Sequence, residues 1–263
     1  MNNKIISLGI LLCLAFSFIA CEEEEQKSEE IGLTNDEESH LLIFSKTAGF
    51  RHESIDVAVP ALTKYAEDRG VSVHATEDAS LFKDDSLARF DAVVFVSTTG
   101  PLFTDEQQAA FERFIRNGGG FAGIHGSSDT QGPDDDDGPN DSWQWYGNLI
   151  GAYFHSHPEQ QEARLIVTES GHLSTNMLDA EWIKFDEWYN FWELPDHVNV
   201  LLELDTESYQ GSKHSGEHPI AWYHEFDGGR SFYTGLGHTD ESWTENDQFM
   251  QHVWGGIQYA MGK

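Results

Sequence analysis

Gly118-Gly-Gly-Phe-Ala-Gly-Ile-His-Gly-Ser-Ser-Asp129 lies near the middle of this 263-residue chain, directly after an amphipathic segment from Thr104 to Asn117. The order of residues predicts a helix, a tight turn, a buried strand and a loop at the strand's carboxyl end. In open α/β sheets, ligands bind outside the carboxyl ends of the strands, so His125 and Asp129 are candidate site residues. A turn followed by a packed strand explains the same glycines equally well.

The segments before this motif predict further strands and helices of the same kind. Apolar or alternating runs indicate three strands, over His40–Ser45, Val71–Ala75 and Asp91–Ser97. A helix is expected from Ser54 to Arg69, in which Pro60 predicts a kink or a late start. The capping box Thr104-x-x-Gln107 opens the next helix. Strands and helices that alternate in this way predict a doubly wound parallel sheet.

The second half of the chain predicts more strands and a closing helix. Strands are expected over 163–168, 198–205, 219–226 and 230–236, with helices over 143–150 and 246–261. Asp227-Gly228-Gly229 is typical of a hairpin turn between the last two strands. With no internal repeat, residues 40–263 are expected to form one α/β domain.

The amino-terminal residues predict a leader and a tether. Lys4, an apolar run from Ile5 to Ala20 and then Cys21 are typical of a secretory signal peptide over residues 1–21, and the run is too short for a spanning helix. Its end resembles a bacterial lipobox with Cys21 lipidated, although Phe18 replaces the usual Leu. The acidic residues 22–39 predict a disordered tether, and they also resemble the surface-export signals of Bacteroidetes-type lipoproteins. We therefore expect a lipoprotein of a Gram-negative cell envelope, attached to the membrane through Cys21.

Charge and cysteine content exclude some functions. Fifteen Lys and Arg against 46 Asp and Glu give a net charge of −31, so nucleic acid is not an expected partner. The two cysteines, Cys13 and Cys21, both lie in the leader, so the mature domain has neither a disulfide nor a thiol nucleophile. Four consecutive Asp within residues 132–141 lack the alternation of a calcium loop and predict a solvated loop.

Histidines gather at the expected strand ends, where they have either structural or chemical roles. They are His52, His125, His155, His157 and His238. His155 and His157 are two residues apart, so on a strand they would share one face and form a metal-binding pair. Asp129, Glu187 and Asp240 are the carboxylates available to complete such a site, but the spacing matches no named zinc motif.

Glu187 lies among aromatic residues in Phe185-Asp-Glu-Trp-Tyr-Asn-Phe-Trp192. Burial against the rings would raise the pKa of its carboxyl group and suit general acid–base catalysis. The alternative is an acid on a helix surface beside core aromatic residues.

Several motifs in order resemble the ThuA-like (trehalose utilisation) family, over residues 40–262. They are Lys46-Thr-Ala-Gly-Phe-Arg-His52, Gly118–Asp129, Tyr146-Gly-x-Leu-Ile-Gly151 with the following His-x-His-Pro, Asp186-Glu-Trp-Tyr189, His218-Pro-Ile-Ala-Trp222 and Gly229–His238. The resemblance implies a flavodoxin-like three-layer α/β/α sandwich, similar to class I glutamine amidotransferases. It also implies a part in the bacterial breakdown of sugars, including steps on 3-keto-glycosides.

The chain departs from the amidotransferases at their nucleophile. Where they have Gly-x-Cys-x-Gly, the comparable segment here is Gly123-Ile-His-Gly-Ser127, and an imidazole cannot replace the thiolate. We therefore expect no glutaminase activity. Ser127 and Ser128 also lack the Gly-x-Ser-x-Gly surroundings of a serine nucleophile.

Three functions remain open. The first is an enzyme acting on sugars or keto-sugars, with His125 as central acid or base and His52, Asp129 and Glu187 beside it. For this enzyme we assign substrate contacts to Arg51, His157, Trp188, His218 and His238. The second is a carbohydrate-binding lipoprotein without catalysis. The third is a hydrolase that uses a divalent metal ion held by His155 and His157.

Overall fold

The computed structural model describes residues 39–133, 138 and 142–263, and these belong to one compact unit over 37–263. The expected signal peptide, Cys21, the acidic tether and most of the aspartate-rich loop lie outside the described residues. Among the helices that the structure does describe, none is both long enough and apolar enough to cross a membrane.

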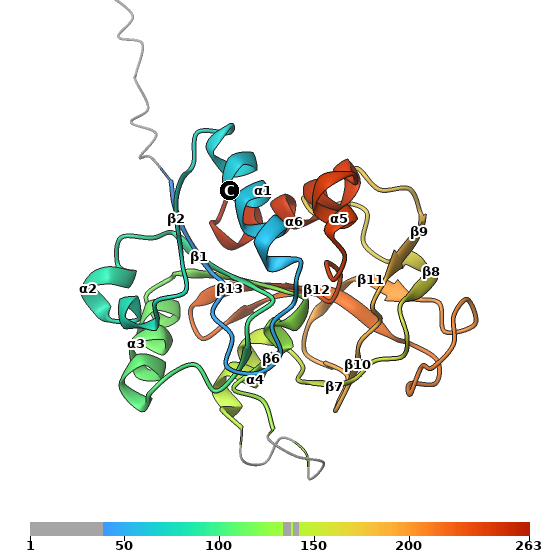
Figure 1. Cartoon of the computed structure of the whole chain (residues 1–263), viewed down its shortest axis with the longest axis horizontal. Helices are drawn as coiled ribbons and strands as arrows, with labels where there is room; N and C mark the ends of the chain where they lie inside the picture. Colours follow the sequence, from blue (N-terminus) through green and yellow to red (C-terminus); the bar gives the residue numbers. More distant parts are fainter. Residues whose placement is uncertain (1–38, 134–137, 139–141) are drawn as a thin grey trace, which may run out of the picture. The chain divides into compact units, whose positions relative to one another are not determined.

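A nine-stranded sheet forms the centre of the unit (Figure 1). Its strands, in spatial order, are β2 Ser72–Thr76, β1 His40–Phe44, β3 Ala92–Val96, β5 Gly120–Ile124, β13 Gly229–Thr234, β12 Pro219–Phe226, β11 Asn199–Leu204, β8 Gln161–Val167 and β9 Glu181–Asp186. The pairings from β2 to β13 are parallel, and those from β13 to β9 are antiparallel. The expected parallel sheet and the β12–β13 hairpin are confirmed, and an antiparallel extension adjoins them.

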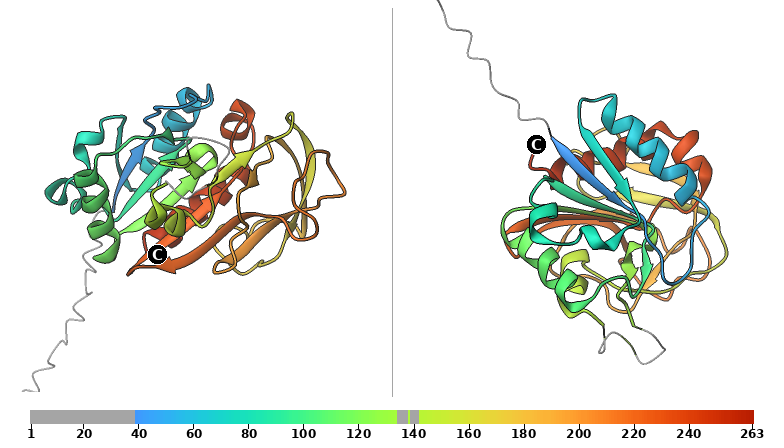
Figure 2. Two further views of the ribbon diagram at one scale, coloured as in Figure 1. Left: turned by 90° about the horizontal axis from the view of Figure 1, so that it is seen from below. Right: turned by 60° about the vertical axis from the view of Figure 1, so that its left-hand side comes forward.

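Helices cover both faces of the parallel part of the sheet, which gives the predicted three-layer sandwich (Figures 1 and 2). One layer contains α1 Ile55–Glu67, α5 Asp240–Thr244 and α6 Asp247–Ala260, and the other contains α2 Asp84–Leu87, α3 Asp105–Arg116 and α4 Gln144–Ile150. Short 3-10 turns lie at Ala79–Leu81 and His125–Ser128. The capping box of Thr104 and Gln107 is present at the start of α3. Pro60 lies inside α1 and does not delay its start.

The glycines of the central motif are needed for the turn and for close packing. Gly118 has a φ of +94°, and a Cβ on Gly120 would lie 2.2 Å from the carbonyl oxygen of Ala260 in α6. The run therefore lets β5 pass directly beneath α6, while β5 itself is fully buried. This packing alone accounts for the glycines, so any function of the motif must rest on the residues that follow them.

Four short strands follow or precede the main strands. β4 Thr99–Gly100 pairs with β6 Asp129–Thr130, and β7 Phe154–Ser156 pairs with β10 Asn190–Phe191. β4 and β6 continue the chain just beyond the carboxyl ends of β3 and β5. The segment that precedes Glu187 is the edge strand β9, so the alternative of a helix-surface acid is wrong.

Candidate functional site

His125 lies at a sharp turn directly after β5. Its φ is +49°, which is uncommon for any residue other than glycine, and Ser97 at the end of β3 has a φ of +48°. Gly126 makes the turn compact, because a Cβ there would lie 3.1 Å from the ring of His52 and 3.2 Å from the Cα of Ser97. Strained residues at adjacent strand ends are typical of functional sites.

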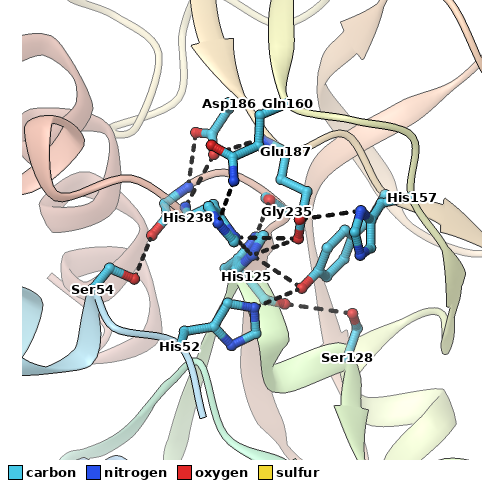
Figure 3. A network of polar contacts seen from close by, with 12 residues as sticks. His52, Ser54, His125, Ser128, His157, Gln160, Asp186, Glu187, Gly235 and His238 are labelled. Carbon is cyan, nitrogen blue, oxygen red and sulfur yellow. Dashed lines mark hydrogen bonds and ion pairs between the residues drawn. The ribbon is translucent and has the colours of Figure 1, made fainter. Parts of the chain in front are cut away.

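Four of the expected site residues converge at this turn: His52, His125, Glu187 and His238 (Figure 3). Each offers one nitrogen or oxygen atom that could bind a metal ion, and these atoms all lie within 4.8 Å of one another. The four residues come from segments far apart in the sequence, after β1, β5, β9 and β13. We call them the His–Glu cluster.

The shortest separations within the His–Glu cluster form a triangle. His125 Nε2 lies 3.2 Å from His238 Nδ1 and 3.4 Å from Glu187 Oε2, and His238 Nδ1 lies 3.2 Å from Glu187 Oε2. The hydroxyl of Tyr189 lies 3.0 Å from His125 Nε2 and 3.4 Å from His52 Nε2. Two imidazole nitrogens and one carboxylate oxygen thus face a common point beside a phenolic hydroxyl.

Hydrogen bonds outside the triangle fix the direction of two imidazoles. His125 Nδ1 lies 2.8 Å from the carbonyl oxygen of Gly235. Since a carbonyl only accepts, Nδ1 carries a proton and Nε2 faces the cluster. The side-chain N–H of Gln160 donates to His238 Nε2 at 2.8 Å, so the proton of the neutral ring is on Nδ1, which points inward.

The carboxylate of Asp186 links the segment that carries Glu187 to the segment that carries His238. Asp186 is fully buried and pairs at 2.9 Å with Lys184 Nζ. It also accepts hydrogen bonds from the backbone N–H groups of Glu187, Gly237 and His238, each at 3.0 Å. A buried charge held in this way fixes Glu187 and His238 relative to one another.

The protonation of Glu187 differs from the expectation. Burial alone would raise the pKa of its carboxyl group, but hydrogen bonds with His125 and His238 outweigh burial and hold the pKa well below the usual range. The predicted raised pKa is therefore wrong, because the neighbouring imidazoles were not included in that argument. Glu187 is ionised, which suits binding a cation or stabilising positive charge rather than donating a proton.

The pKa values of His52 and His238 are shifted in opposite directions. Burial, followed by repulsion from His125 and His238, lowers the pKa of His52 to about 3. For His238, burial opposes protonation, but the hydrogen bond and the charge of Glu187 raise its pKa overall. His157 extends the network on the exposed side, with Nδ1 3.1 Å from Glu187 Oε1.

Asp129 lies close to the site but outside the cluster. It is on β6, and burial raises the pKa of its carboxyl group to about 6. Its charge also contributes to the raised pKa of Tyr189, which places the two groups in the same neighbourhood.

Two expected substrate contacts are wrong because the side chains are inaccessible. Trp188 is fully buried, and its ring N–H donates to the carbonyl oxygen of Gln161 at 2.9 Å. His218 is also fully buried, with Nε2 2.9 Å from the carbonyl oxygen of Tyr189 and Nδ1 2.9 Å from the hydroxyl of Tyr209. Both residues support the loop that carries Glu187 rather than contacting a ligand.

His155 and Arg51 point to other partners. His155 Nδ1 lies 2.9 Å from Ser156 Oγ, and its ring packs against Trp192, whereas His157 faces Glu187. The expected metal-binding pair of His155 and His157 is therefore not formed. Arg51 makes ion pairs of 2.9 Å with Asp56 and Glu77.

Four residues of the site were not predicted from the sequence: Tyr189, Asp186, Lys184 and Gln160. The first two lie in the Asp186-Glu-Trp-Tyr189 motif, which could have indicated a site, but residue type alone gives no sign of which side chains point inward. A cavity of about 570 Å³ includes Gly118 and Arg113 in its lining and so lies at the opposite end of β5 from His125. The side-chain chemistry, not this cavity, therefore locates the candidate site.

Comparison with known proteins agrees with the fold. The sequence model of the family ThuA, trehalose utilisation, matches residues 40–260. No curated protein matches the chain.

The chain is similar to several solved structures. A ThuA-like protein from Bacteroides uniformis has a TM-score of 0.70 at 22% identity, covering 84% of this chain and 91% of that one. A ThuA-like protein from Parabacteroides merdae has a TM-score of 0.66 at 18% identity, covering 86% and 91%. A β-galactosidase from Bacillus circulans sp. alkalophilus has a TM-score of 0.53 at 12% identity, covering 85% of this chain but only 31% of that one. At these identities the likeness shows the fold alone.

Proposed function

The chain belongs to the ThuA family of trehalose utilisation, and on that premise we propose that its His–Glu cluster is the catalytic centre of an enzyme acting on a disaccharide or keto-glycoside. The family places the protein in carbohydrate utilisation. The reaction and the residues that perform it are the proposal.

The observation that carries the proposal is the triangle of 3.2–3.4 Å between His125 Nε2, His238 Nδ1 and Glu187 Oε2. A site that only binds sugar needs hydrogen-bond donors and acceptors, but it does not need two imidazoles turned toward one ionised carboxylate. Such an arrangement suits either proton transfer or the binding of a cation.

The separations fit a divalent transition-metal ion. Ligand atoms about 2.05 Å from a tetrahedral zinc ion lie roughly 3.3 Å apart, which matches the triangle. The N–H of His125 Nδ1 donates to a backbone carbonyl, as in histidines that bind metals. His52 brings a further imidazole, whose Nε2 lies 3.4 Å from the hydroxyl of Tyr189 beside the triangle. We therefore favour His52, His125, Glu187 and His238 as the metal ligands, in place of His155 and His157.

The protein's own residues supply the rest of the chemistry. A bound divalent ion would supply a Lewis acid that polarises a carbonyl oxygen or activates water. Burial, with the nearby charge of Glu187, keeps the pKa of Tyr189 well above its ordinary value, so its phenol stays neutral and can donate a hydrogen bond to a substrate oxygen. Without an ion, His238 would hold a proton beside ionised Glu187, and His125 Nε2, 3.2 Å away, could relay it to a substrate oxygen.

Two further parts of the proposal rest on the sequence. An imidazole at position 125 and the absence of cysteine after Cys21 argue against glutaminase chemistry. The lipobox-like ending at Cys21 supports a lipid anchor in the cell envelope.

The test is the metal content of the purified protein, prepared without a histidine tag, together with its turnover of trehalose and of 3-keto-trehalose followed by NMR. We expect one equivalent of a transition metal, lost in Glu187→Gln together with turnover. His155→Ala is the matched control and keeps both, because His155 lies outside the cluster.

A metal-free protein that still converts the sugar would favour proton transfer by the histidines. Saturable sugar binding without any product would instead contradict catalysis and favour a carbohydrate-binding protein.

A further inference from the structure

Phe50 is the most exposed large apolar side chain that the structure describes, with 66% of its surface accessible. A single exposed apolar residue is ordinary and needs no explanation. The position of Phe50 is what sets it apart. Its ring lies 4.9 Å from that of His52, at 87°, and the ring of His52 lies 4.7 Å from that of His125.

The backbone beneath Phe50 is held in place although the side chain is free. Thr99 Oγ1 donates to the carbonyl oxygen of Phe50 at 2.6 Å, and the N–H of Ala48 donates to the carbonyl oxygen of Thr99 at 2.8 Å. The loop after β1 is thereby fixed to β4. Since the loop is already ordered, a ligand that covers the ring does not have to order it, and less binding energy is lost.

The other exposed residues of the site are polar. His157 is 43% exposed and contacts Glu187, and the exposed Gln160 places its amide on His238. An apolar ring beside imidazole and amide groups matches a molecule with one apolar face and a hydroxyl-bearing edge.

We propose that Phe50 is the stacking platform that selects a pyranose sugar and holds it over the His–Glu cluster. The ring would cover a sugar face that carries only C–H groups, as in the glucose units of trehalose, and hydroxyl groups at the sugar's edge would reach His157 and Gln160. The inference rests on the carbohydrate class of the proposed function and adds the residue that recognises the sugar. It also supplies the aromatic substrate contact that was expected of Trp188, which is fully buried.

Phe185 provides a matched control. It is also exposed, at 49%, but it alternates with the buried Lys184 and Asp186 on β9 and so faces away from the cluster. Removing its ring therefore changes a similar apolar surface without touching the site.

The experiment titrates the metal-loaded protein with trehalose by calorimetry and compares wild type, Phe50→Ala, Phe50→Trp and Phe185→Ala. Loss of an aromatic contact should weaken binding of trehalose about 5- to 10-fold in Phe50→Ala. Phe50→Trp should bind as tightly as wild type or more tightly, and Phe185→Ala should be unchanged. Because stacking acts on bound substrate and transition state alike, turnover at saturating sugar should change little in Phe50→Ala while KM rises.

Three results would contradict the proposal that Phe50 stacks on the sugar. They are unchanged binding in Phe50→Ala, equal weakening in Phe185→Ala, and loss of metal or of thermal stability in Phe50→Ala, which would make the ring structural. Failure of wild type to bind trehalose would also reject it. Metal content and its loss in Glu187→Gln are read independently, so the proposed catalytic centre stands or falls separately.

Discussion

Two regions of this molecule bury histidines, and they treat the ring nitrogens in opposite ways. Outside the His–Glu cluster, His218 directly before β12 and His252 in α6 have a partner at each nitrogen; for His252 these are the carbonyl oxygen of Ser174 and the hydroxyl of Thr234. At the carboxyl ends of the parallel strands, His125 and His238 turn nitrogens toward each other and toward Glu187.

The difference distinguishes histidines with a structural role from histidines that can bind a ligand or transfer a proton. An imidazole with a complementary partner at each nitrogen has no capacity left for a ligand, and burial lowers the pKa of His218 and of His252 to about 4. In the His–Glu cluster one carboxylate is shared among several imidazoles, so some of their binding capacity remains for an ion, a water molecule or a substrate.

The largest effect should come from His125→Asn. Asparagine tolerates the left-handed backbone at this position, so the turn should be retained. Turnover should fall by about 10²- to 10⁴-fold because the central imidazole is lost. Initial rates and urea unfolding of the same preparation measure both quantities.

His252→Asn is the control for that variant. It should lose stability by about 1–3 kcal/mol, because the buried hydroxyl of Thr234 loses its partner, while turnover per folded molecule is kept. If His125→Asn unfolds the protein and His252→Asn abolishes turnover, the distinction between the two regions is wrong.

Asp186→Asn should have the next largest effect. The amide oxygen can still accept hydrogen bonds from the N–H groups of Glu187 and His238, which share one oxygen of Asp186. The –NH2 group then replaces the oxygen that accepts from Gly237, and it cannot neutralise Lys184, whose side chain is only 4% exposed. Removing one partner of a buried ion pair costs about 3–5 kcal/mol. Urea unfolding should show this loss, and metal affinity should fall because the two sides of the cluster are no longer held together.

A double variant tests whether the unpaired charge of Lys184 causes the loss of stability in Asp186→Asn. In Lys184→Met with Asp186→Asn, the uncompensated charge is gone, so stability should recover in part while metal affinity stays low. Equal destabilisation in the single and double variants would show that the charge of Lys184 is not the reason.

A smaller effect on stability is expected when the pH is lowered. Because the pKa of His252 is about 4 when folded and about 6.5 when unfolded, the unfolded chain takes up a proton between these values and the folded protein does not. Stability should therefore fall as the pH drops from 6.5 to 4, by about 3 kcal/mol for this residue. The slope should be shallower in His252→Asn, and an unchanged slope would assign the acid sensitivity to other groups.

The parallel half of the fold could be predicted because its strands are continuous apolar runs, such as Ala92–Val96, which is buried throughout. The polarity of the edge strand β9 could not be predicted from the sequence. Its apolar residues Ile183 and Phe185 face solvent, while Lys184 and Asp186 face inward, so its polarity is the reverse of the usual pattern.

The same limit applies to the site. The position of His52, His125, His155, His157 and His238 near expected strand ends predicted a group of histidines at one edge of the sheet, but not which of them would converge. Residue type gave no information on how deeply a side chain is buried. Trp188 and His218 were therefore predicted to contact the substrate although both are fully buried. Burial is decided by long-range packing, which local sequence patterns do not contain.

The smallest effect is expected from Arg51→Gln, at a residue that adjoins the cluster in sequence but not in contacts. Its guanidinium pairs with Asp56 and Glu77, and all three side chains are at least 42% exposed. Exposed ion pairs contribute about 0.2–1 kcal/mol and weaken with salt, so stability should change by less than about 1 kcal/mol and kcat/KM only slightly. Kinetics and unfolding at low and high salt measure this, with Arg113→Gln, which breaks the exposed pair with Asp84, as control. A fall in kcat/KM of more than about tenfold at both salt concentrations, absent from the control, would give Arg51 the substrate contact predicted from the sequence. The functional region would then include a cation in the loop after β1 and would no longer be limited to the imidazoles that share Glu187.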